Sequence, residues 1–253
     1  MSPSESFPIQ ILAIGAHPDD VEISCGGTLA LAGRQGFSVA ILDLTRGELS
    51  TNGTVEERAA EAAEAAGLLG VRIRRNAGLP DGGINPFDPA QVRSVVRILR
   101  ELRPSILLTH APVDRHPDHV EASRIVDRAW YLAGLRQFDP DGQAAPHRAE
   151  GRYHFASRIG FQPTFVVDVT SAWEEKRRAV LAHRSQVSRS TDARATPLND
   201  PDFFSRIEAR ARHFGSQIGA LHGEPFRATE PIGFRTLEAL LRSARPEPGA
   251  FTG

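Results

Sequence analysis

The N-terminal part of the chain alternates short apolar runs with helical segments, and this alternation constrains the fold more than any other feature. The apolar runs are Ile11–Ile14, Ser38–Thr45, Val71–Arg75 and Ser105–Thr109. The helices predicted between them cover about Thr28–Arg34, Thr54–Leu69 and Pro89–Leu102. Such alternation favours a parallel sheet with helices on both faces. The sequence therefore predicts an α/β fold of three layers, with a doubly wound, mostly parallel, Rossmann-like sheet of strand order 3-2-1-4-5.

The second half of the chain has a weaker pattern. A helix is predicted at Val120–Leu132, and the polar stretch Gln137–Gly151 is typical of an insertion or pocket rim. Further strands (Phe155–Gly160, Thr164–Val169) and helices (Ala172–His183, Pro201–Leu221) follow. We find no repeat and no linker. We therefore expect residues 1–253 to form one domain, with a disordered tail from about Arg245.

Composition excludes several classes of function. The formal net charge of −1 gives no overall field for nucleic acid or anionic lipid, so neither is expected as a partner. Cys25 is the only cysteine, which rules out an intrachain disulfide and fits the reducing cytoplasm. Residues Met1–Gln10 lack the features of a secretory signal, and no apolar run approaches the roughly 20 residues that span a bilayer.

Two strings of imidazole and carboxylate side chains follow the first and fourth predicted strands. They are Gly15-Ala16-His17-Pro18-Asp19-Asp20 and Asp114-Arg115-His116-Pro117-Asp118-His119. Strands 1 and 4 are neighbours in the predicted order, and their carboxyl ends flank the crevice where such sheets bind ligands. The strings should therefore meet. Together they supply three mixed N/O ligands, a spare carboxylate and a spare imidazole, which is what a hydrolytic metal site needs.

These strings, with Glu22 and Gly26-Gly27, resemble those of the LmbE-like (PIG-L-like) zinc de-N-acetylases, which remove acetyl groups from N-acetylglucosaminyl compounds. Further segments are similar to the bacillithiol-biosynthesis branch, which deacetylates N-acetylglucosaminyl-malate. They are Leu44–Thr54, Glu57-Arg58, Val113–Arg115, Ser185-Gln186 and Thr196–Leu198. The resemblance covers about residues 8–235 and implies a homo-oligomer, often a hexamer.

The resemblance implies that His17, Asp20 and His119 are the metal ligands. The i, i+3 spacing of His17 and Asp20 supports this, because such a pair in a turn can face one point. Two histidines and one aspartate leave a position open for water, as a catalytic zinc requires. The same residue types also suit non-haem Fe²⁺. The alternative is a capping His17 and a core His119.

The resemblance also assigns the catalytic roles. Asp19, adjacent to a ligand, is the expected general base, and the alternative is a helix cap. His116 is expected to stabilise the oxyanion and protonate the leaving amine, with Asp118 orienting its ring. The alternatives are that His116 is a solvated loop histidine and that Asp118 is a helix cap. His110 carries no motif and is interpreted as structural.

Substrate contacts are expected from four residues. Arg58 and Arg115 are candidate clamps for the two carboxylates of malate, because a guanidinium suits a carboxylate. Glu48 and Asn52 could reach sugar hydroxyls. Lys176 is the only lysine among 30 lysine and arginine residues, so the chain is rich in arginine. Most of these arginines must be solvated at the surface, which is the alternative for Arg58 and Arg115. For Glu48 and Asn52 the alternative is that they only stabilise a turn.

The sequence thus predicts a cytoplasmic, zinc-dependent hydrolase that removes the N-acetyl group from a small amino-sugar conjugate, with N-acetylglucosaminyl-malate as the favoured substrate. Free N-acetylglucosamine or chitin oligosaccharides are the alternative substrates. A non-catalytic metal-containing carbohydrate-binding protein is a second alternative, but binding alone would need neither Asp19 nor His116. A nucleotide-cofactor oxidoreductase is disfavoured because Gly15-Ala16-His17 does not begin a G-x-G-x-x-G turn.

Overall fold

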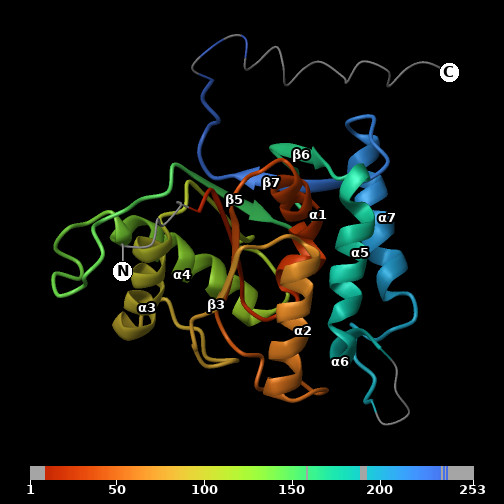
Figure 1. Ribbon diagram of the computed structural model, residues 1–253, viewed down its shortest axis with the longest axis horizontal. Helices are drawn as coiled ribbons and strands as arrows, with labels where there is room; N and C mark the ends of the chain where they lie inside the picture. The colour runs from red at the N-terminus through yellow and green to blue at the C-terminus, as the bar shows by residue number, and fades with distance from the viewer. Residues whose placement is uncertain (1–8, 158, 189–192, 235, 237, 239–253) are drawn as a thin grey trace, which may run out of the picture.

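A single seven-stranded sheet organises the protein. The computed structural model describes residues 9–157, 159–188, 193–234, 236 and 238, and its sheet has the order β3-β2-β1-β4-β5-β7-β6 (Figure 1). The strands are β1 Ile11–Gly15, β2 Val39–Asp43, β3 Ile73–Asn76, β4 Ile106–His110, β5 Gly151–Phe155, β6 Phe165–Asp168 and β7 Gly223–Ala228. The predicted α/β class and the order 3-2-1-4-5 are confirmed. The unexpected strand β7 extends the sheet, pairing antiparallel with both β5 and β6.

Helices cover both faces of the sheet (Figure 1). They are α1 Asp20–Arg34, α2 Val55–Leu68, α3 Pro89–Leu102, α4 Pro117–Ala133, α5 Trp173–Ala182, α6 Arg184–Val187 and α7 Phe203–Ser216, with a 3-10 turn at Thr170–Ala172. Leu12 and Ile14 pack with the buried side chains of α3 and α4. Ala13 packs on the opposite face with those of α1, α2 and α5. A strand buried on both faces reads as a continuous apolar run, which explains the N-terminal pattern.

The parallel strands end at a common edge of the sheet. Ile11 of β1 is aligned with Val39 of β2 and with Ile106 of β4. The turns that leave β1, β2 and β4 therefore start side by side, although they are far apart in the chain.

Helix α1 begins earlier than predicted. It starts at Asp20 and breaks at Cys25, whose backbone is not helical (φ −138°, ψ 19°). After the break, the Glu224 carboxylate accepts hydrogen bonds from the N–H groups of Gly27 (3.0 Å) and Thr28 (2.7 Å). Glu224 thus caps the second part of the helix as an N-cap side chain would. The predicted start near Thr28 marks this restart, not the start of the helix.

Other boundaries also differ from the expectation. The predicted strand at Phe155–Gly160 is instead β5, which ends at Phe155, and α7 is shorter than the predicted helix Pro201–Leu221. The capping box at α2 forms as expected, since the Glu57 N–H donates to the Thr54 hydroxyl (3.1 Å) and the Thr54 N–H to the Glu57 carboxylate (2.8 Å). The predicted disordered tail from Arg245 lies outside the described residues. Among the helices that are described, none has the length and apolar character to span a membrane.

The Lys176–Glu224 pair gives a testable prediction about stability. Lys176 Nζ lies 2.5 Å from Glu224 Oε1, and both side chains are buried. Lys176→Met leaves a buried carboxylate without its cation, so we expect the free energy of unfolding to fall by about 3–5 kcal/mol. Glu224→Gln leaves the ammonium unpaired and should cost a similar amount.

Urea unfolding of the two single variants and the double variant measures the coupling between the two residues. The double variant should lose less stability than the sum of the single losses. Arg177→Met, which removes an exposed cation from the same helix, is the control. Additive effects within about 0.5 kcal/mol would contradict the prediction.

Candidate active site

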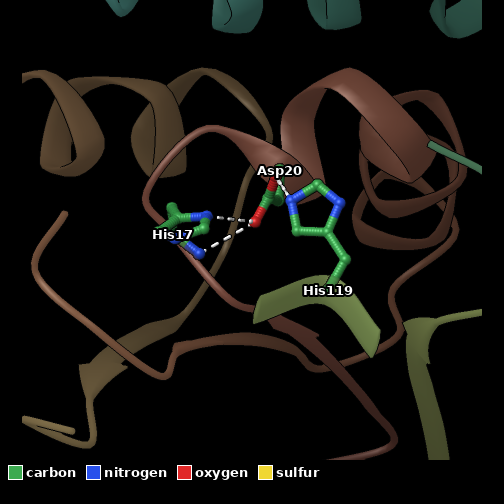
Figure 2. A group of neighbouring side chains, drawn as sticks. All are labelled: His17, Asp20 and His119. Carbon is green, nitrogen blue, oxygen red and sulfur yellow. Dashed lines mark hydrogen bonds and ion pairs between the residues drawn. The ribbon is translucent and has the colours of Figure 1, made fainter. Parts of the chain in front are cut away.

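Three side chains from the two strings converge beyond the carboxyl ends of β1 and β4. His17 lies in the turn after β1, Asp20 is the first residue of α1, and His119 lies in the first turn of α4. Figure 2 shows Asp20 between the two imidazole rings, with all three side chains pointing toward one another. Their potential ligand atoms all lie within 4.8 Å of one another. The fold therefore brings the three predicted metal ligands together.

The Asp20 carboxylate joins the parts of this cluster. Its Oδ2 accepts a hydrogen bond from the backbone N–H of His17 (2.8 Å), and its Oδ1 lies 3.1 Å from His119 Nε2. His110, at the end of β4, places its Nε2 3.2 Å from the same carboxylate. Burial disfavours the charged carboxyl, but the nearby His119 and His110 outweigh burial and lower the pKa of Asp20.

The donor set suits a divalent cation. Two imidazoles and one carboxylate are the ligand types of catalytic zinc sites with three protein ligands. Burial opposes protonation of His17, yet hydrogen bonds with Asp118, Asp20 and Asp81 raise its pKa to about 12. Burial likewise opposes protonation of His119, but Asp20 and Asp114 raise its pKa to about 9. The surrounding carboxylates thus favour a positive charge at His17 and His119.

Asp81, which the sequence analysis did not select, faces the other side of His17. Its Oδ1 lies 3.1 Å from His17 Nε2, and its Oδ2 accepts the Leu49 N–H (2.8 Å). His17, Asp81 and Asp118 form a second group whose ligand atoms meet the same 4.8 Å distance. Its place in the sequence could have identified Asp81, because it precedes Gly82-Gly83 in the loop after β3, at the same edge of the sheet.

Asp114 contacts His119, the second histidine among the predicted metal ligands. Its Oδ1 lies 3.2 Å from His119 Nδ1 and accepts the His116 N–H (2.9 Å), while the Ser157 hydroxyl donates to its Oδ2. A carboxylate on the second nitrogen of a ligating histidine fixes the orientation of the ring. Asp114 stood in the second string without an assigned role.

Asp19 directly precedes Asp20, a predicted metal ligand, and has a strained backbone conformation. It has φ 122°, which side-chain-bearing residues rarely adopt, and its carboxylate is buried. That carboxylate makes no capping bond to α1, so the alternative role of helix cap does not apply. Burial raises the pKa of Asp19 to about 6, although the Arg58 guanidinium opposes this rise. A carboxyl with such a pKa can exchange a proton near neutral pH.

His116 and Asp118 are arranged differently from the expectation. The Asp118 backbone N–H donates to His116 Nδ1 (3.2 Å), so His116 is the N-cap of α4. The Asp118 carboxylate instead accepts the Gly82 N–H (2.7 Å) and lies 3.3 Å from His17 Nε2. Asp118 therefore contacts the His116 ring through its backbone N–H, while its side chain contacts His17. Burial and the neighbouring His119 lower the pKa of His116.

The four predicted substrate contacts separate into two groups. Arg115 is exposed beside His116, and Glu48 is exposed while accepting the N–H groups of Asp81 and Arg46. Asn52 uses both ends of its amide on the backbone of Arg194. Arg58 is buried and donates to protein acceptors next to Asp19. The structure thus departs from the expectation that Arg58 and Asn52 face a substrate.

Comparisons with known proteins agree with this geometry. A sequence model of the PIG-L family, described as GlcNAc-PI de-N-acetylase, matches residues 12–130. A diacetylchitobiose deacetylase of Thermococcus kodakarensis is 32% identical over 70% of each chain. A 1D-myo-inositol 2-acetamido-2-deoxy-alpha-D-glucopyranoside deacetylase of Catenulispora acidiphila is 30% identical over 79% of this chain and 76% of its own length.

A solved structure extends the similarity to the whole fold. The crystal structure of a conserved protein from Thermus thermophilus is 38% identical, with a TM-score of 0.80 over 89% of this chain and 97% of that chain. The sequence matches and the converging His and Asp side chains lead to one conclusion. This chain belongs to the PIG-L (LmbE-like) family and is an amidohydrolase of the N-deacetylase type.

Proposed function

We propose that the protein is a zinc-dependent de-N-acetylase of an N-acetylglucosaminyl conjugate. The observation that carries this proposal is the position of Asp19, a buried carboxylate adjoining the cluster of His17, Asp20 and His119. A protein that only bound a sugar would have no use for a buried, strained carboxylate at that point. The deacetylase names of the two relatives support the same reaction.

Zinc held by His17, Asp20 and His119 would polarise the acetamide carbonyl and make a water molecule more acidic. Asp19, which directly precedes the ligand Asp20, then accepts the proton of the attacking water as the general base. Because Nδ1 of His116 accepts a hydrogen bond, the neutral ring carries its proton on Nε2. His116 can therefore donate a hydrogen bond to the developing oxyanion. The proton that Asp19 has taken from the water then passes to the nitrogen of the leaving amine as the C–N bond breaks. The products are acetate and a free glucosaminyl amine.

The favoured substrate is N-acetylglucosaminyl-malate, and Arg115 is its proposed anion contact. Arg115 is exposed and directly precedes His116 in the chain, so its guanidinium is available to a substrate that reaches His116. We propose that exposed Glu48 contacts a sugar hydroxyl. The relatives named for diacetylchitobiose and an inositol conjugate make those substrates the alternatives. A cytoplasmic homo-oligomer, a hexamer by the family resemblance, completes the proposal.

Among the predictions that follow from the proposed function, the first concerns Asp19. Asp19→Asn keeps the shape of the side chain but removes the proton acceptor, so acetate release should fall by about 10²–10⁴-fold while bound zinc is retained. Acetate release and metal content are measured on the same preparation. Asp141→Asn, at an exposed aspartate in the loop after α4, is the matched control and should keep full activity. Unchanged turnover in Asp19→Asn would remove the base assignment.

The second prediction concerns the metal. Treatment with a chelator should abolish activity and lower the unfolding midpoint. Zinc at 100 times its Kd should restore about 2.7 kcal/mol of stability, because it binds only the folded chain. His119→Ala should lose this gain, whereas His213→Ala, at an exposed histidine of α7, should keep it. Anaerobic Fe²⁺ serves as the second metal. A wild-type protein that neither cation stabilises would contradict the proposed site.

The third prediction concerns the substrate. The kcat/KM for N-acetylglucosaminyl-malate should exceed that for N-acetylglucosamine, diacetylchitobiose and the inositol conjugate. Arg115→Met removes a charge-assisted hydrogen bond, so KM for the malate conjugate should rise about ten- to hundredfold. The same variant should leave KM for neutral N-acetylglucosamine unchanged, which is the internal control. A preference for diacetylchitobiose would replace the malate conjugate in this proposal.

A further inference from the structure

We propose that Arg58 is a positioning residue that holds the carboxylate of Asp19 in place for proton transfer, and that it does not bind substrate. The inference rests on the proposed function, in which Asp19 is the general base. It changes the role expected from the sequence, where Arg58 was a clamp for an anionic aglycone. Three features of the described residues support it: the contacts of the guanidinium, the space left by Gly47, and the backbone of Asp19.

The guanidinium of Arg58 is enclosed by protein acceptors. The residue is only 3% exposed. Its Nη1 donates to the carbonyl oxygen of Gly47 (3.0 Å), and its Nη2 donates to the carbonyl oxygen of Pro18 (2.6 Å) and to Asp19 Oδ2 (3.2 Å). Both Nη atoms thus donate to protein acceptors, and Nε is buried without a partner. Because the residue is buried, no exposed edge of the guanidinium is left for a bidentate carboxylate from solvent. The geometry favours an internal partner over a ligand from solvent.

Gly47 makes the space that the guanidinium fills. Its backbone has φ +67°, and a Cβ atom placed there would lie 1.8 Å from Arg58 Nη1. Any larger residue would therefore collide with the guanidinium or displace it. The loop after β2 is built around the Arg58 head group, which is a further sign that this group has a fixed place.

The backbone of Asp19 needs an external support. At φ 122° an aspartate is strained, and such strain persists only where the surroundings hold it. Arg58 contacts the carbonyl oxygen immediately before Asp19 as well as the Asp19 carboxylate. Arg58 thus fixes both the Pro18–Asp19 peptide group and the side chain of Asp19. Rotation of the Asp19 carboxylate away from Arg58 would break a buried ion pair.

The helix that carries Arg58 is itself well anchored. Arg58 lies in the first turn of α2, and its N–H donates to the Thr54 carbonyl oxygen (3.0 Å) within the capping box. The local sequence from Thr54 to Arg58 therefore sets where the guanidinium reaches. The support of Asp19 comes from α2 and the loop after β2, not from the string that contains Asp19.

The test separates positioning from substrate binding by the kinetic parameter that changes. Arg58→Met is assayed with N-acetylglucosaminyl-malate and with neutral N-acetylglucosamine, and metal content is measured on each sample. A positioning role predicts that kcat falls about 10–100-fold with both substrates, because a displaced base reacts poorly. KM should change less than about threefold, and the metal content should match that of the wild type.

Two further variants address the same contacts. Arg58→Lys keeps the charge but cannot reach all three acceptors, so its kcat should lie between those of Arg58→Met and the wild type. Gly47→Ala keeps Arg58 but displaces its guanidinium, so its kcat should also fall with both substrates. Arg100→Met is the matched control, since Arg100 is equally buried and donates to three carbonyl oxygens at the end of α4 and in the segment that follows it. It should lose stability but keep kcat.

The outcomes are distinct. A rise in KM for the malate conjugate alone, with unchanged kcat, would overturn the proposal in favour of the anion clamp. Unchanged kinetics with both substrates would also overturn it. A crystal structure of Arg58→Met in which the Asp19 carboxylate keeps its position would do so without any assay. If the wild-type protein releases no acetate from any substrate, the proposed function fails, and that structure still decides the position of Asp19.

Discussion

The site depends on one buried carboxylate, that of Asp20, which joins segments distant in the sequence. It accepts the backbone N–H of His17, contacts His119 from α4, and lies against His110 from the end of β4. These contacts are possible only because β1 and β4 are adjacent and end at the same level of the sheet. The strand order therefore brings the site together through one residue, Asp20, at the first position of α1.

Around this carboxylate, further acidic side chains hold the loops together. Two hydrogen bonds join the loops after β2 and β3, since Glu48 accepts the Asp81 N–H and Asp81 accepts the Leu49 N–H. Asp118 from α4 accepts the Gly82 N–H. The same carboxylates of Asp81 and Asp118 face His17 Nε2. The loops that would form the rim of a sugar pocket thus contact His17, one of the proposed metal ligands, so a change in these loops should also move His17.

How much the sequence could predict follows from the range of the interactions involved. Strand order and the meeting of the two strings depend on local apolar periodicity and on a general topological rule, and both were predictable. The restart of α1 after the break at Cys25 depends on Glu224, nearly two hundred residues away, and no local pattern predicts that contact. Strand β7, which carries Pro225 within GEPFRA, lacks the apolar run of a central strand. It forms because β5 and β6 supply partners on both sides.

The same reasoning explains why the site residues differed in predictability. His17, Asp20 and His119 belong to compact strings, so residue type and spacing are informative before folding. Arg58 and Asp81 act through neighbours that only the folded chain provides, and an arginine in an arginine-rich chain carries little information by itself. Whether a side chain's polar atoms bond to the protein or are exposed decides whether we interpret the residue as structural or as a substrate contact. Asn52 and Arg58 use their polar atoms on the protein, whereas Arg115 is exposed next to His116 in the chain. Selectivity for the aglycone should therefore reside in the exposed loop after β4, and catalytic competence in the buried contacts behind Asp19.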